Sequence, residues 1–119
     1  MKNINHPRLR RHYKIPALPK CDFCSSVTVC WLYLTRAFTV PRGDSVIHFG
    51  PDWATCHQCH QFIERKDCDG FVKRVAHGLR IDMNARPDAG PFYRAEFESF
   101  LRSTNGPPLF MPEALCGTN

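Results

Sequence analysis

The chain has 119 residues, of which 43% are apolar and 12% aromatic. This is enough for one globular domain with a modest core, and it is too apolar for a disordered chain. The longest apolar run, residues 27–34, is too short to span a bilayer. Residues 1–20 contain no apolar segment of the kind that a signal peptide needs, so we expect a cytoplasmic protein.

The excess positive charge is concentrated at the N-terminal end. The formal net charge is +5, yet residues 1–20 alone carry +6 and residues 21–119 carry −1. Prolines interrupt any helical period in residues 1–20, which predicts an extended basic arm. Such an arm can follow phosphates, and its tyrosine can stack on a base; the candidate residues are Arg8, Arg10, Arg11, Tyr13 and Lys14. The alternatives are a solvated tail, or a segment that packs Ile15 and Leu18 against the domain.

Two pairs of cysteines share the spacing Cys-x-x-Cys. Cys21 and Cys24 form the first pair, and Cys56 and Cys59 form the second. One tight turn of this spacing supplies two thiolates to a tetrahedral zinc ion, and two such turns close the site without a position for water. The sequence therefore predicts one structural Zn²⁺ ion. Redox disulfides and a secreted disulfide framework are the alternatives.

Four further residues could replace a cysteine as a metal ligand. Cys30 follows the first pair on a predicted strand, and Cys68 lies in a predicted turn between helices. Both are expected to be packed thiols, which are common in protein cores. His57 and His60 flank Cys59, and we expect them on the surface of a helix or beside the metal ligands.

The segment between the two cysteine pairs has the pattern of a β-structure. Residues 27–34 are rich in β-branched and aromatic side chains, which predicts a strand, and residues 38–40 could extend the sheet. Residues 41–44 read Pro-Arg-Gly-Asp, a turn signal. Residues 45–49 then form a return strand, which completes a β-hairpin.

Three helices are predicted after the hairpin. The first covers residues 55–66, with Thr55 as its N-cap and Gln58 completing a capping box. The second covers about 70–79, with Asp67 or Asp69 as its cap. The third begins near Pro91 and buries the apolar face Tyr93, Phe97, Phe100 and Leu101.

An apolar tail follows the last helix, which Asn-Gly-Pro-Pro at residues 105–108 should stop. The tail contains Leu109, Phe110 and Met111. It would either fold back on the core or contact a partner protein.

These elements predict an α+β fold with one zinc-stabilised domain over residues 21–119. Residues 21–66 form its core of zinc turn, β-hairpin and helix, and residues 67–119 add C-terminal helices and a tail. This order resembles the treble-clef zinc fold through Cys21-Asp-Phe-Cys24 and Cys56-His-Gln-Cys59-His60. The chain is also similar to small uncharacterised zinc-finger proteins of actinobacteria and their phages, a resemblance that implies no activity.

The sequence favours a binding function over catalysis. The first interpretation is a non-enzymatic module that binds nucleic acid or a nucleoprotein complex through the basic arm. The alternative is an adaptor or inhibitor that docks on a single protein partner through Leu109, Phe110 and Met111. A third interpretation follows from the resemblance, because treble-clef scaffolds carry His-Asn-His nucleases. The chain lacks the Asp-His pair and the loop asparagine of that class, so we expect no nuclease activity.

Overall fold

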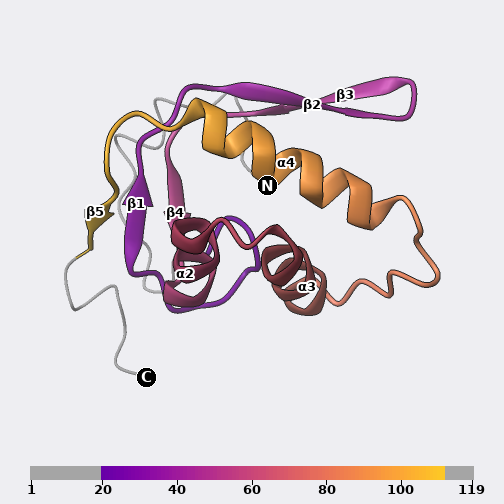
Figure 1. The fold of residues 1–119 in the computed structure, drawn as a ribbon, viewed down its shortest axis with the longest axis horizontal. Helices are drawn as coiled ribbons and strands as arrows, with labels where there is room; N and C mark the ends of the chain where they lie inside the picture. Colours follow the sequence, from indigo (N-terminus) through magenta and orange to yellow (C-terminus); the bar gives the residue numbers. More distant parts are fainter. Residues whose placement is uncertain (1–19, 112–119) are drawn as a thin grey trace.

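A computed structural model of the chain describes residues 20–111. The predictions for residues 1–19 and 112–119 lie outside this range. The described elements follow in the order β1 (Trp31–Tyr33), β2 (Phe38–Arg42), β3 (Ser45–Phe49), β4 (Trp53–Thr55), α2 (His57–Arg65), α3 (Cys68–Gly78), α4 (Ala89–Ser103) and β5 (Leu109–Phe110). The predicted α+β class is confirmed (Figure 1).

The strands form two separate antiparallel groups. One is a three-stranded sheet in the order β4-β1-β5, and the other is the hairpin β2–β3. Helix α4 lies between the hairpin and α3, and α3 lies beside α2 (Figure 1). The hairpin therefore packs on α4, α4 packs on α3, and α3 packs on α2, which lies near the three-stranded sheet.

A hairpin forms where it was predicted, but its turn is shorter than residues 41–44, because Pro41 and Arg42 belong to β2. Residues 38–40 do not extend the sheet of β1, since β2 and β3 form a sheet of their own. Its strands pair from Phe38 with Phe49 to Arg42 with Ser45. Gly43, with φ +61°, begins the two-residue turn, a backbone conformation that glycine adopts without steric cost. The turn signal in the sequence was sufficient because a hairpin turn is a local structure.

The strand prediction before the hairpin is wrong in its length. Of residues 27–34, only Trp31–Tyr33 form a strand. The hydroxyls of Ser26 and Thr28 are 2.9 Å apart, and the Thr28 N–H donates to the Ser26 hydroxyl. The Thr28 N–H is thus satisfied by a side chain rather than by a neighbouring strand, and Val27 is 54% exposed.

Strand β4 was not predicted. It has three residues and pairs with β1, with Trp31 opposite Thr55 and Tyr33 opposite Trp53. A strand this short carries too little alternation to be read from sequence. Its importance lies in its position, because it leads directly into the second cysteine pair.

The two later helices are close to their predicted bounds. Asp67 caps α3 by accepting a hydrogen bond from the Gly70 N–H at 2.9 Å. Helix α4 starts at Ala89, two residues before the predicted Pro91. None of the described helices is long and apolar enough to cross a membrane.

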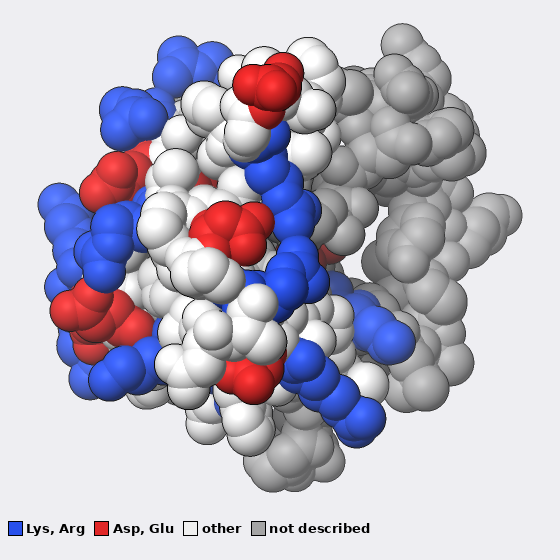
Figure 2. Space-filling view, turned by 90° about the vertical axis from the view of Figure 1, so that its right-hand side faces the viewer, with Lys and Arg blue, Asp and Glu red and all other residues white. Residues whose placement is uncertain are grey.

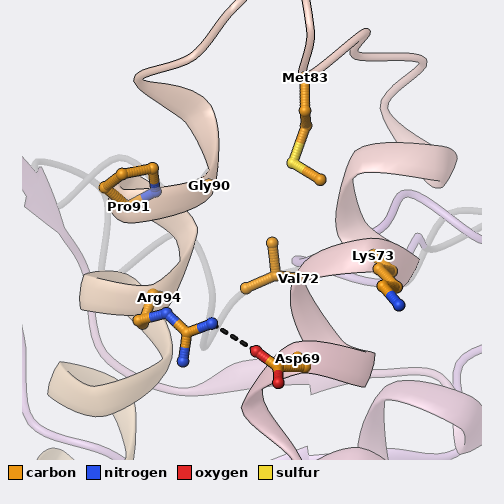
Figure 3. A pocket seen from close by; sticks show the side chains of 7 residues that line it. All are labelled: Asp69, Val72, Lys73, Met83, Gly90, Pro91 and Arg94. Carbon is orange, nitrogen blue, oxygen red and sulfur yellow. Dashed lines mark hydrogen bonds and ion pairs between the residues drawn. The ribbon is translucent and has the colours of Figure 1, made fainter.

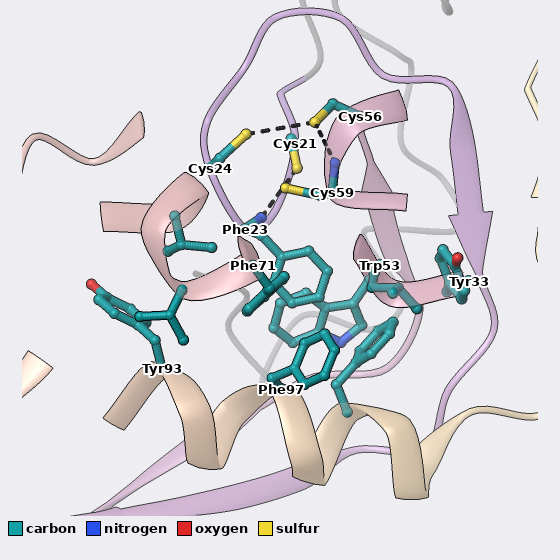
Figure 4. Close-up of a cluster of buried hydrophobic side chains, with 14 of the residues drawn as sticks. Cys21, Phe23, Cys24, Tyr33, Trp53, Cys56, Cys59, Phe71, Tyr93 and Phe97 are labelled. Carbon is teal, nitrogen blue, oxygen red and sulfur yellow. Dashed lines mark hydrogen bonds between the residues drawn. The ribbon is translucent and has the colours of Figure 1, made fainter. Parts of the chain in front are cut away.

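The core is aromatic and begins inside the first cysteine pair. Phe23 stacks on Trp53 with ring centroids 4.6 Å apart, and the rings of Phe71 and Phe100 contact Phe23 edge-on at 4.9 and 5.0 Å. Each of these four side chains is at most 1% exposed. Figure 4 shows the rings of Phe23, Trp53 and Phe71 on one side of the four cysteines. The core and the cysteine site therefore form one continuous packed unit.

One carboxyl group is buried in this unit. Glu96 of α4 is 1% exposed, and its Oε2 atom has no hydrogen-bond partner among the described residues. Burial raises the pKa of Glu96 to about 8, from an ordinary value of 4.5. The folded state therefore binds this proton more tightly than the unfolded chain. The free energy of unfolding should fall as the pH rises from 4.5 toward 8.

We expect Glu96→Gln to remove most of that pH dependence, because the amide is neutral at every pH. The wild-type free energy of unfolding should fall by up to about 1.4 kcal/mol per pH unit in this window. Chemical denaturation between about pH 6 and pH 9 measures the decline. Glu98→Gln is the matched control, since Glu98 is exposed on the same helix. Equal pH dependence in wild type and Glu96→Gln would contradict the assignment.

Candidate metal centre

The four predicted ligands come together in one buried cluster. The sulfur atoms of Cys21, Cys24, Cys56 and Cys59 all lie within 4.8 Å of one another, and each residue is at most 3% exposed. The Cys24 and Cys56 sulfurs are 3.6 Å apart. A tetrahedral ion with metal–sulfur bonds of ~2.3 Å would separate its sulfurs by roughly 3.8 Å. The cluster therefore has the size of a site for one metal ion (Figure 4).

All four cysteines are free thiols in the structure. A redox dithiol requires only the two sulfurs of one Cys-x-x-Cys pair. Here the sulfurs of the two pairs also lie next to each other, although Cys24 and Cys56 are 32 residues apart in the sequence. This arrangement favours a shared metal over two independent disulfides.

The first pair lies on a tight turn. The Cys21 carbonyl accepts from the Ser25 N–H at 3.0 Å, and Ser25 has a left-handed φ of 67°. The Phe23 N–H points at the Cys21 sulfur at 3.4 Å, which stabilises a thiolate there. Asp22 ties the turn to β4, because its backbone N–H donates to the Ala54 carbonyl and its carboxylate accepts from the Ala54 N–H.

The second pair lies at the start of α2, but the predicted cap is wrong. Thr55 ends β4, and Cys56 is the N-cap, whose sulfur accepts from the Cys59 N–H at 3.3 Å. The N-cap therefore lies one residue later than predicted, and Gln58 does not occupy the capping-box position. Sulfur is an unusual capping acceptor, and a thiolate at this position also gains from the positive end of the helix dipole.

The thiols of the cluster perturb one another strongly. Hydrogen bonds with the other three thiols, with Cys21 first, lower the pKa of Cys56 well below its usual value. Burial raises the pKa of Cys21, and hydrogen bonds with its neighbours raise that of Cys59. Four buried negative charges cannot coexist at this separation without a cation. A bound divalent ion would supply that charge.

Helix α3 closes the site from the other side. A side chain at Gly78 would place its Cβ 2.2 Å from the Cys24 carbonyl oxygen and 2.8 Å from the Cys24 Cβ. Real Cβ atoms do not approach so closely, and the nearest obstacle is backbone that cannot swing away. The C-terminal turn of α3 therefore rests directly on the first cysteine turn.

A cation on α3 fits the charge that a metal-loaded cluster would carry. The Arg74 Nη2 atom lies 4.0 Å from the Cys56 sulfur, and the Arg74 Nε is buried without a partner among the described residues. Burial works against this charge, but attraction to the sulfurs of Cys24 and Cys56 outweighs it and raises the pKa of Arg74. The donor set and its surroundings therefore both suit a thiolate-bound metal.

The alternative ligands lie outside the cluster. His60 hydrogen-bonds through Nδ1 to the Tyr33 hydroxyl at 2.6 Å and stacks on Trp31 at 3.9 Å. His57 is exposed and accepts from the Trp31 indole N–H at 3.4 Å. Both histidines hold the sheet against α2.

Cys68 is half-buried, and the metal-binding group found among residues 20–111 does not include it. Cys30 is disulfide-bonded. The prediction that Cys30 is a packed thiol is therefore wrong, and the metal ligand set remains the four predicted cysteines.

A separate concave region lies between α3 and α4. It encloses about 470 Å³ and is lined by apolar side chains such as Val72 and Met83 together with Lys73, Asp69 and Arg94. Arg94 donates to Asp69 across the two helices (Figure 3). The lining contains no thiol, hydroxyl or imidazole, and its charged groups are Asp69, Lys73 and Arg94.

The predicted nucleic-acid-binding residues, Arg8, Arg10, Arg11, Tyr13 and Lys14, lie outside the described residues. The described range, 20–111, has eleven basic and ten acidic residues. On the face in Figure 2, a line of basic side chains is flanked by acidic ones rather than forming a patch of one sign. Residues 20–111 are therefore close to neutral, and this face of them alternates in charge.

The predicted partner-contact residues lie at the edge of the three-stranded sheet. Leu109 and Phe110 form β5 and are 51% and 61% exposed. Met111 is half-buried, and its N–H donates to the Cys30 carbonyl at 2.7 Å. The tail thus folds back as a strand while leaving two large apolar side chains in solvent.

Comparisons of the chain with family models, curated proteins and solved structures find no match.

We expect Cys59→Ser to bind no metal and to unfold at lower temperature, because the change removes one of the four sulfurs of the cluster. Mass spectrometry under native conditions measures the metal, and thermal unfolding measures stability. Cys68→Ser is the matched control, since Cys68 is a free thiol outside the cluster. Full metal content in Cys59→Ser, or equal loss in Cys68→Ser, would contradict the assignment.

Proposed function

We propose that the chain is a non-enzymatic binding module of the treble-clef type, held together by one structural zinc ion. The observation that carries the proposal is the closed, buried cluster of four cysteines within 4.8 Å of one another. Four thiolates fill a tetrahedral coordination shell, which leaves no position for substrate or water. An ion in such a site stabilises the fold and does not activate a nucleophile.

Zinc is proposed because the donors are four soft thiolates in a compact group. Tetrahedral sulfur coordination suits zinc or iron. Zinc requires no redox partner and is the usual ion in pairs of Cys-x-x-Cys turns. The mass of the bound ion distinguishes the two metals.

The order of elements supports the treble-clef type. The first cysteine turn precedes the hairpin β2–β3, and the second pair lies at the N-terminus of α2. Both the loop position of the first pair and the helical position of the second agree with the resemblance seen in the sequence.

Nucleic acid, alone or within a nucleoprotein complex, is our first proposed partner. The support is the distribution of charge: residues 1–20 carry +6, whereas the rest of the chain carries −1. A metal-stabilised domain that is nearly neutral would then present one strongly basic arm. Binding of this kind depends on phosphate contacts and is sensitive to salt.

We expect the triple change Arg8→Gln, Arg10→Gln and Arg11→Gln to weaken binding to single-stranded DNA at low salt by tenfold or more, on the order of what several lost phosphate contacts produce. The slope of log affinity against log salt concentration should become shallower by about two, because each of the three lost phosphate contacts contributes ~0.7 to it. Fluorescence anisotropy with a labelled oligonucleotide measures both quantities.

The control for this experiment changes three exposed arginines of the folded domain, Arg36, Arg65 and Arg86, to glutamine. It removes the same charge from a different place. If both triple variants bind equally, net charge rather than the arm accounts for the affinity. If neither the two triple variants nor the wild-type protein binds the oligonucleotide, the nucleic-acid proposal fails.

A protein partner at β5 is a second candidate, favoured by the exposure of Leu109 and Phe110. We expect a photo-crosslinking amino acid at position 110 to give a discrete protein adduct in the native cell. The same probe at Val46, which is 50% exposed on the hairpin, serves as the control. Equal labelling from the two positions, or an adduct that disappears with nuclease, would remove this candidate.

A further inference from the structure

The metal centre has a neighbour that the cysteine motif does not predict. Arg74 and Gly78 are four residues apart on α3, which places them on one side of the helix. Gly78 packs against the Cys24 backbone, and the Arg74 guanidinium reaches the Cys56 sulfur at 4.0 Å. One side of α3 therefore contacts one cysteine from each pair.

The charge of the loaded site explains why a cation lies there. Four thiolates around a divalent ion leave a net charge of roughly −2. Backbone N–H groups of Phe23 and Cys59 point at two of the sulfurs, but they offer partial charges only. Among the described residues, the hydrogen bond from a cationic side chain to the sulfurs comes from Arg74.

The position of the half-buried Arg74 side chain is difficult to explain without that negative charge. Its Nε has no partner among the described residues and no access to solvent, and a buried donor without a partner destabilises a protein. Neither salt bridge found among the described residues involves Arg74, since they join Arg42 with Asp88 and Arg94 with Asp69. Among the described residues, the Cys56 sulfur is the acceptor that the Arg74 guanidinium reaches, at 4.0 Å.

We propose that Arg74 is the counter-cation of the metal–thiolate centre, and that through its charge α3 and the bound ion hold each other in place. The proposal rests on the zinc site proposed above and adds a residue outside the predicted treble-clef core, 21–66. Loss of the ion would leave Arg74 without a full counter-charge and weaken the packing of α3. Loss of the Arg74 charge would loosen the ion.

The test compares Arg74→Met, which keeps length and removes charge, with Arg74→Lys, which keeps charge. Lys73→Met is the matched control, because Lys73 is the exposed neighbour on the same helix. The zinc-loaded proteins are mixed with the dye chelator 4-(2-pyridylazo)resorcinol, and the rate of zinc transfer is followed by absorbance. We expect transfer to be about 10- to 100-fold faster for Arg74→Met, the usual effect of removing an outer partner of a metal ligand. Arg74→Lys should stay close to wild type, and Lys73→Met should equal it.

Two further readouts separate the charge effect from a simple packing defect. In the cadmium-113 form, the NMR resonance of the metal should shift in Arg74→Met and not in Lys73→Met, because thiolate hydrogen bonding changes. Amide exchange in α3 should quicken in zinc-loaded Arg74→Met and in wild type stripped of metal. Both effects follow if α3 and the ion stabilise each other.

The inference is overturned if zinc-loaded Arg74→Met transfers its metal at the wild-type rate. It is also overturned if Arg74→Lys loses its metal as readily as Arg74→Met, or if neither variant folds. In either case the positive charge of residue 74 would not be what retains the metal. If Arg74→Met does not fold with zinc while Arg74→Lys does, the inference is supported. A wild-type protein without zinc would instead refute the proposed metal site itself.

Discussion

The constraint on which the structure depends is the meeting of two cysteine turns that are far apart in sequence. The sulfurs of Cys24 and Cys56 are 3.6 Å apart, although neither turn has enough local structure to hold the other. The aromatic core starts within the first turn, at Phe23, and α2 starts within the second, at Cys56. A bound ion would therefore fix the origin of the core and the origin of a helix at the same point, which explains how a loop-rich chain of this length maintains a single packed unit.

The helices beyond residue 66 belong to this unit rather than being attached to it. Helix α3 touches the first cysteine turn through Gly78 and the second pair through Arg74. Helix α4 contributes Phe100 to the ring cluster around Phe23, and its Glu96 is buried as well. The predicted division into a core and a helical extension describes the order along the chain, but packing and charge join the two parts.

Features governed by local chemistry could be predicted from the sequence. The cysteine spacing identified the four thiols that cluster, the Pro-Arg-Gly-Asp turn identified the hairpin, and Asp67 marked the start of α3. Features that depend on distant partners could not. Strand β4 forms through its pairing with β1, which includes Thr55. Because Thr55 is a strand residue, the N-cap of α2 is Cys56. Helical periodicity likewise indicates the apolar side of α3, but it does not show that the half-buried Arg74 places its guanidinium beside the Cys56 sulfur.

X-ray absorption spectroscopy of the purified protein at the zinc edge tests the central claim most directly, because it reports the kind and number of atoms around the ion. The account predicts one zinc per chain with four sulfur neighbours at ~2.3 Å and no nitrogen or oxygen in that shell. A shell containing nitrogen or oxygen would contradict the closed four-cysteine centre, and so would a folded protein that holds no metal.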